Sequence, residues 1–171
     1  MVQFLQAGYG LGVSEARVHR EIERKLEVPP RFRLPDLAAA DGVGAALAQP
    51  TLKLVAVYYD TADLRLARSR ITLRRRTGGG DDGWHLKLPH ADEATRDEVQ
   101  LPLGNEVEPP EELVSLVLGI TRGAPLIAVA TLKNERRPTR LRDELGGPLA
   151  EVTDDRVSVV KAGKVAARFR E

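Results

Sequence analysis

Short segments in which apolar and polar residues alternate recur along this chain, separated by turn residues. Alternation with a period of two is typical of β-strands, and strands joined by short turns pair antiparallel. A flexible hairpin connection is predicted at Thr77-Gly-Gly-Gly-Asp-Asp-Gly83, because Gly and Asp tolerate positive φ. The expected strands cover residues 18–28, 52–59, 71–77, 83–89, 95–103, 127–137, 149–160 and 165–171.

Few segments predict helices. Residues 35–47 begin with proline at a position that suits a first helical turn, and residues 110–118 have apolar spacing suited to packing on a sheet. One short turn or helix is expected within residues 60–68. With 171 residues the chain is long enough for one core, so we expect a loosely ordered leader over residues 1–17 and a single domain over residues 18–171.

Composition restricts the kinds of partner. The chain has 26 Lys and Arg against 25 Asp and Glu, and this net charge of +1 favours neither nucleic acid nor a membrane surface. The chain has no cysteine, which excludes disulfides and thiolate metal sites. No apolar run approaches the roughly 20 residues of a membrane span, and no signal peptide is recognisable. A cytoplasmic protein is therefore expected.

The segment Glu21-Ile-Glu-Arg-Lys25 carries the first candidate site. On a strand, Glu21, Glu23 and Lys25 share one face. Two carboxylates about 7 Å apart beside an ammonium group can hold a divalent cation and one end of a polyphosphate. The alternative is a salt-bridged surface helix, because Glu21 and Lys25 are also an i,i+4 pair.

Other expected strands also carry charged residues on one face and apolar residues on the other. The charged or polar rows are Arg74 and Arg76, His85 and Lys87, Arg96, Glu98 and Gln100, Asn134 and Arg136, and Glu151, Thr153 and Asp155. Such rows belong either to a half-solvated sheet or to a barrel with a charged interior. The three adjacent arginines do not make one nucleic-acid patch, because a strand turns Arg75 away from its neighbours, and aromatic residues are only 4% of the chain.

A series of motifs in a fixed order resembles one known family. It comprises Glu21-x-Glu23-x-Lys25, Tyr58-Tyr-Asp-Thr61, Leu73-Arg-Arg-Arg76, Trp84-His-Leu-Lys-Leu-Pro89, Arg96-x-Glu98, Asn134-x-Arg136 and Leu149-Ala-Glu-Val-Thr-Asp-Asp155. Over residues 18–171 this set resembles the CYTH superfamily, also called triphosphate tunnel metalloenzymes. It is most similar to bacterial CYTH domains that often carry a C-terminal CHAD helical domain.

The resemblance implies an α+β fold, an antiparallel eight-stranded β-barrel that forms a tunnel with a few flanking helices. It implies a hydrolase that needs Mg²⁺ or Mn²⁺ and acts on triphosphates, first of all inorganic tripolyphosphate. The alternatives are a module that binds triphosphate or polyphosphate without turnover, and an activity like that of class IV adenylate cyclases. A half-buried sheet whose charges serve solubility also remains open, as do the oligomeric state and a CHAD domain in a longer chain.

Site roles follow from the same resemblance. Glu21, Glu23 and Lys25 would be catalytic. The substrate-binding set would be Lys25, Arg74, Arg76, Lys87, Arg96 and Arg136. The metal-binding set would be Glu21, Glu23, Glu98, Glu151, Asp155 and Glu171. Family members usually continue with an acidic strand reading roughly Glu-Ile-Glu, whereas this sequence ends at Glu171. We therefore expect either a piece of a longer chain or a tunnel that lacks one metal ligand at its C-terminal end.

Overall fold

A computed structural model describes residues 2–5, 17–90, 95–105, 107–161 and 163–171, with only the backbone for residues 2–5 and 19–23. Within these residues, ten strands form one antiparallel sheet. The strands are β1 (Val2–Leu5), β2 (Arg17–Arg24), β3 (Ala45–Ala48), β4 (Leu52–Asp60), β5 (Thr72–Thr77), β6 (Gly83–Pro89), β7 (Thr95–Leu101), β8 (Ile127–Arg142), β9 (Pro148–Lys161) and β10 (Lys164–Arg170). The helices are η1 (Leu37–Ala39, a 3₁₀ helix), α1 (Arg65–Arg68), α2 (Glu111–Leu116) and α3 (Leu118–Thr121).

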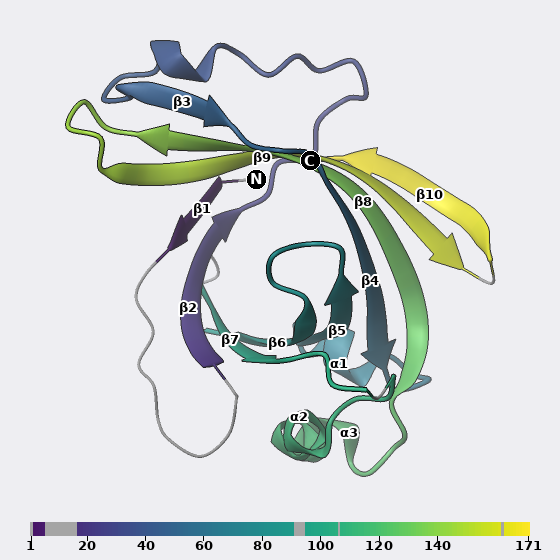
Figure 1. Cartoon of the computed structure of the whole chain (residues 1–171). Coiled ribbons are helices and arrows are strands. Elements are labelled where there is room, and N and C mark those ends of the chain that lie inside the picture. Colours follow the sequence, from purple (N-terminus) through teal and green to yellow (C-terminus); the bar gives the residue numbers. More distant parts are fainter. Residues whose placement is uncertain (1, 6–16, 91–94, 106, 162) are drawn as a thin grey trace.

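The strand pairings lead around an interior. β9 pairs with β8 along its length and also with β1, so the pairings run from β9 through β1, β2, β7, β6, β5, β4 and β8 back to β9. Figure 1 looks along this interior and shows the strands curled around it. The β1–β9 link consists of two residue pairs, whereas the β8–β9 hairpin pairs from Thr131↔Val160 to Arg142↔Pro148. The long hairpin is therefore the main scaffold of this tunnel-like barrel.

The expected α+β fold, an antiparallel sheet with a few flanking helices, is confirmed. The sheet has ten strands in place of eight, because β3 and β10 extend it beyond the eight strands that surround the interior. No helix in the described part of the chain is long and apolar enough to cross a membrane.

Two segments at the N-terminal side differ from expectation. The helix predicted over residues 35–47 is wrong: η1 ends at Ala39, and β3 pairs with the edge of β8. Gly42 adopts φ +76°, a left-handed conformation that ends the turn, and a Cβ at Gly44 would lie 2.5 Å from the Asp143 carbonyl oxygen. Within the predicted leader, residues 2–5 form β1, whereas residues 6–16 lie outside the described residues.

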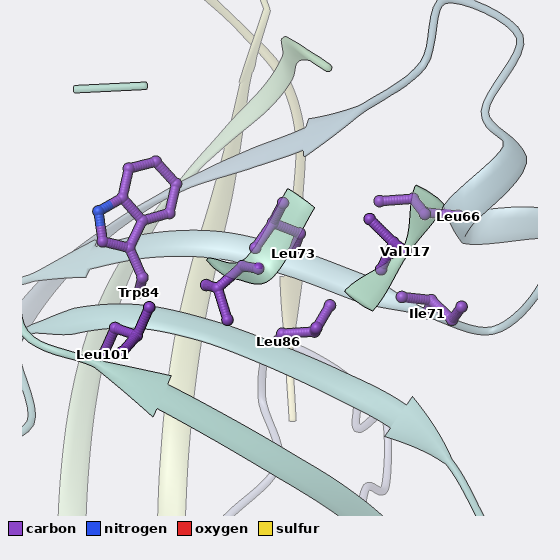
Figure 2. Packing of buried hydrophobic residues seen from close by; sticks show 8 residues of the cluster. Leu66, Ile71, Leu73, Trp84, Leu86, Leu101 and Val117 are labelled. Atoms are coloured by element: carbon purple, nitrogen blue, oxygen red, sulfur yellow. The ribbon is translucent and has the colours of Figure 1, made fainter. Parts of the chain in front are cut away.

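The hydrophobic core lies on the outside of the barrel wall. Leu73, Trp84 and Leu86 project from β5 and β6 and pack with residues of the helices, among them Leu66 and Val117 (Figure 2). All of them are at most 1% exposed. Figure 1 shows α2 and α3 on the outer side of β5 and β6. Because successive strand residues alternate between faces, burying this apolar row outside turns the charged rows of the same strands inward.

Asp60 fixes the start of α1. Its carboxylate is 4% exposed and accepts hydrogen bonds from the backbone amides of Leu66, at 2.9 Å, and Ala67, at 3.0 Å. These amides lack partners inside the helix, so the carboxylate acts as its N-terminal cap. The cap seats α1 against the end of β4 and helps to cover the core.

Candidate functional site

The strand register aligns the charged rows across the sheet. Residues that lie directly opposite each other in an antiparallel pair project from the same face. The opposed pairs include Arg74 with His85, Lys87 with Glu98, Arg136 with Asp155, and the backbone positions of Glu21 and Arg96. The rows predicted from single strands therefore belong to one continuous face.

Four basic side chains meet at a cavity of about 110 Å³ inside the barrel. They are Lys25, Arg74, Arg76 and Arg136. The one carboxylate in the described lining is Glu171, whose Oε1 lies 3.8 Å from Lys25 Nζ. The remaining lining residues are Leu54, Ala56, Tyr58, Leu132, Asn134, Val157 and Phe169. A small cavity with this excess of positive charge suits an anion that carries several charges.

Arg76 is the most buried cation of this group, at 7% exposed. Burial lowers its pKa to about 10, and the charges of Arg74 and Arg136 act in the same direction. Its Nη2 forms an ion pair with the carboxylate of Asp81, which lies in the β5–β6 connection. Arg76 Nε is buried and has no hydrogen-bond partner among the described residues. A bound polyanion would relieve both the repulsion and the unmet hydrogen bond.

Asn134 contributes a second buried polar atom without a partner. Its Oδ1 makes no hydrogen bond within the described part of the chain, and its side chain lines the same cavity. An amide side chain offers an oxygen to a cation in one orientation and an NH₂ group to a phosphate oxygen in the other. The cavity thus has unused hydrogen-bonding capacity suited to a phosphate–metal ligand.

Arg136 is tied to a buried carboxylate. Its Nε lies 2.9 Å from Asp155 Oδ1, and its Nη2 lies 2.7 Å from Oδ2. Asp155 is 0% exposed, and its backbone exchanges hydrogen bonds of 2.8 and 3.0 Å with Glu171. The two-pronged pair fixes the guanidinium group in the wall. Asp155, predicted as a metal ligand, thus binds Arg136 through both carboxylate oxygens.

A second buried pair joins β6 to β7. His85 Nδ1 lies 2.8 Å from Glu98 Oε1, and both residues are at most 4% exposed. Burial raises the pKa of Glu98, but the hydrogen bond to His85 and the charges of Lys87, His85 and Arg74 outweigh it and bring the pKa down to about 2. Burial lowers the pKa of His85, although Glu98 opposes that effect. The ionised Glu98 carboxylate therefore accepts a hydrogen bond from His85 Nδ1 and fixes the orientation of the ring.

His85 is the site residue to which the sequence analysis gave no role. The available signal was its place in the row of Lys87, on the strand that precedes Glu98. His85 Nε2 also lies 3.0 Å from the backbone oxygen of Asp81. It therefore connects the barrel wall to the β5–β6 connection.

Arg96 lies at a second cavity, of about 470 Å³, next to α1. Its Nη1 donates to the Arg70 carbonyl oxygen at 2.7 Å. This cavity shares Tyr58 and Leu132 with the first one, so the two are neighbours along the interior. Arg96 therefore lies at a different cavity from the four clustered cations. Lys87, another predicted substrate-binding residue, lies close enough to Glu98 for its charge to lower the Glu98 pKa.

The CYTH domain family matches residues 19–165 of the chain. The chain belongs to this family. The uncharacterized proteins MT2285 and Rv2226, from two strains of Mycobacterium tuberculosis, are each 43% identical to this CYTH domain over 148 residues. The match covers 85% of this chain but only 28% of each relative, so the chain spans 28% of their length. The CYTH superfamily includes triphosphatases and cyclases, and its members generally depend on a divalent cation.

Those predicted cation ligands whose side chains the structure describes have separate contacts in this CYTH domain. Glu98 forms a hydrogen bond with His85. Glu151 Oε2 lies 3.4 Å from Arg140 Nε, and Glu171 Oε1 lies 3.8 Å from Lys25 Nζ. Among the described side chains, no three His, Cys, Asp or Glu residues gather into a possible metal site. The side chains of Glu21 and Glu23 lie outside the described residues, so their role stays a prediction.

The backbone nevertheless places Glu23 of β2 in line with other residues that can bind a cation. Glu23 is opposed to Gln3 of β1, and Gln3 is opposed to Glu151 of β9. Glu23 and Glu151 therefore occupy one row across three strands. Carboxylates and amide oxygens are the ligands that Mg²⁺ and Mn²⁺ prefer. The donor types at these positions fit a hard divalent cation.

Proposed function

We propose that this CYTH domain hydrolyses a triphosphate, with inorganic tripolyphosphate as its substrate, by a reaction that depends on Mg²⁺ or Mn²⁺. The observation that supports the proposal most strongly is the cavity lined by Lys25, Arg74, Arg76 and Arg136. Arg76 lies buried beside Arg74 and Arg136, whose charges lower its pKa, so an anionic ligand in this cavity would offset their mutual repulsion. The cavity is small, which favours an inorganic chain over a bulky organic group.

The side chains of the wall would hold and orient the substrate. Phosphoryl transfer requires mainly positioning and neutralisation of charge. Arg74 and Arg76 can each contact phosphate oxygens with a planar fork of donors, and Lys25 can follow a terminal phosphate with its mobile ammonium group. Asp155 fixes the guanidinium group of Arg136, which would therefore present a positive charge to the substrate from a fixed position.

Glu21 and Glu23 are the residues that we propose hold the cation. Their carboxylates would hold a divalent cation, which would supply positive charge to offset the charge that develops on the phosphate oxygens.

A phosphate-release assay tests this function. We expect the protein to release phosphate from tripolyphosphate with Mg²⁺ or Mn²⁺, and to stop in excess chelator. The double variant Glu21→Gln/Glu23→Gln should lose at least about 100-fold in kcat and still bind the anion, because Gln retains the shape but not the charge that a hard cation requires. Hydrolysis that continues in chelator, or an unchanged rate in the double variant, would contradict the metal-dependent reaction.

A second candidate is a module that binds triphosphate without turnover. It is favoured by the contacts of two predicted cation ligands, since Asp155 pairs with Arg136 and Glu98 with His85 in the barrel wall. The same assay distinguishes the two candidates. Tight binding of tripolyphosphate without phosphate release under any divalent cation would support the binding module.

A further inference from the structure

The connection between β5 and β6 folds toward the barrel interior, while Gly80, Asp81 and Asp82 stay exposed. Figure 1 shows it curled within the outline of the strands. Gly78, with φ +95°, passes so close to β4 that a Cβ there would lie 2.0 Å from the Lys53 carbonyl oxygen. This close approach requires glycine and directs residues 79–82 toward the interior.

Two contacts with the barrel wall anchor this connection at Asp81. Its backbone oxygen lies 3.0 Å from His85 Nε2 and accepts a hydrogen bond from Gln100 Nε2 at 3.4 Å. The neighbouring Asp82 accepts a hydrogen bond from the amide of Gly79 at 2.7 Å, which tightens the turn. The backbone of the connection is thus fixed independently of the Asp81 carboxylate.

The carboxylate of Asp81 pairs with Arg76, the most buried cation of the cavity. A carboxylate and a phosphate present pairs of oxygens to a guanidinium group in the same planar arrangement. The two side chains differ in exposure: that of Asp81 is 51% exposed and that of Arg76 only 9%. Asp81 can therefore turn into solvent by rotating its side chain, whereas Arg76 stays in the wall.

We propose that the Asp81 carboxylate occupies the place of a substrate phosphate on Arg76 in the free protein, and that a triphosphate must displace it to bind. This inference rests on the proposed function and adds that Asp81 lowers the apparent affinity for the substrate. An internal competitor reduces the apparent affinity by the fraction of molecules in which Arg76 is free. It also neutralises a buried guanidinium group when no substrate is present.

Calorimetric titration of the protein with tripolyphosphate tests the inference. Asp81→Asn keeps the shape and removes the charge, so the Kd should fall roughly tenfold. Asp82→Asn removes the same charge from the same connection without a contact to Arg76, and its Kd should change less than about twofold. In an Arg76→Met background, Asp81→Asn should bring no gain, because the competing pair no longer exists.

The outcomes separate this inference from the function on which it rests. Binding by the parent with no gain in Asp81→Asn, or an equal gain in Asp82→Asn, would overturn the displacement alone. Weaker binding in Asp81→Asn would also overturn it, because Asp81 would then assist the ligand, for instance by holding its cation. Failure of both the parent and Asp81→Asn to bind tripolyphosphate would overturn the proposed function and the displacement together.

Discussion

At the scale of single residues, the arginines of the cavity are not equivalent. Burial lowers the pKa of Arg76 to about 10, and the like charges of Arg74 and Arg136 add to this effect. Arg136 instead forms a two-pronged pair with Asp155, which is 0% exposed. Arg76 is thus available to a ligand, whereas the guanidinium group of Arg136 is held in the wall by Asp155.

Replacing each arginine by methionine should separate these two roles. Arg76→Met should weaken tripolyphosphate binding roughly 10- to 100-fold and leave the free energy of unfolding nearly unchanged. Arg136→Met leaves Asp155 buried without its partner and should lower the free energy of unfolding by about 3 kcal/mol. Urea unfolding and calorimetric titration of both variants measure the two effects.

Each variant serves as the control for the other, because both replace an arginine in the same cavity by a side chain of similar length. Equal losses of stability in the two variants would show that the Arg136–Asp155 pair has no special structural role. Unchanged affinity in Arg76→Met would remove Arg76 from the binding site.

At the scale of elements, the His85–Glu98 pair fastens β6 to β7 in the barrel wall. Both groups titrate at lower pH in the folded state than in the unfolded chain, since the pKa of Glu98 falls from 4.5 to about 2 and that of His85 falls below 6.5. The unfolded chain therefore binds protons first as the pH falls. Both groups stabilise the fold at neutral pH, and their contribution declines on acidification.

The stability of the protein should accordingly fall below pH 6.5 through His85, and further between about 4.5 and 2 through Glu98. The loss of the Glu98 contribution should lower the free energy of unfolding by about 3 kcal/mol. Urea unfolding at pH 7, 5 and 3 measures it. Glu98→Gln should flatten the acid part of the profile, whereas Glu111→Gln, at an exposed position of α2, should leave the profile as in the parent. An unchanged acid slope in Glu98→Gln would contradict this account.

The elements also show what the sequence could predict. β4, β5 and β6 begin and end within one residue of expectation, because alternation and flanking turns determine a half-buried strand locally. The sequence does not predict β3, because Ala45–Ala48 has no alternation and becomes a strand only by pairing with β8. Of the site, alternation predicted that Arg74 and Arg76 share one face of a strand, whereas the inward direction of that face was implied by the family resemblance. The contact of Asp81 with Arg76 was not, since it depends on how the connection folds back into the barrel.

At the scale of the whole molecule, the barrel separates two environments. Its outer wall packs an apolar row against α1, α2 and α3, and its interior holds the charged rows. A half-buried sheet with its charges in solvent would place the arginines apart, whereas here Arg74, Arg76 and Arg136 converge on one cavity. The architecture therefore concentrates positive charge in a confined space, which strengthens its attraction for a polyanion.

The most direct test of the central claim, that this interior binds a triphosphate together with a divalent cation, is a crystal structure of the protein with tripolyphosphate and Mn²⁺. The account predicts phosphate density inside the barrel on Arg74, Arg76 and Arg136, and an anomalous Mn²⁺ peak beside the carboxylates of Glu21 and Glu23. Phosphate bound only on the outer surface, or Mn²⁺ bound away from β2 with the cavity filled by water alone, would contradict it.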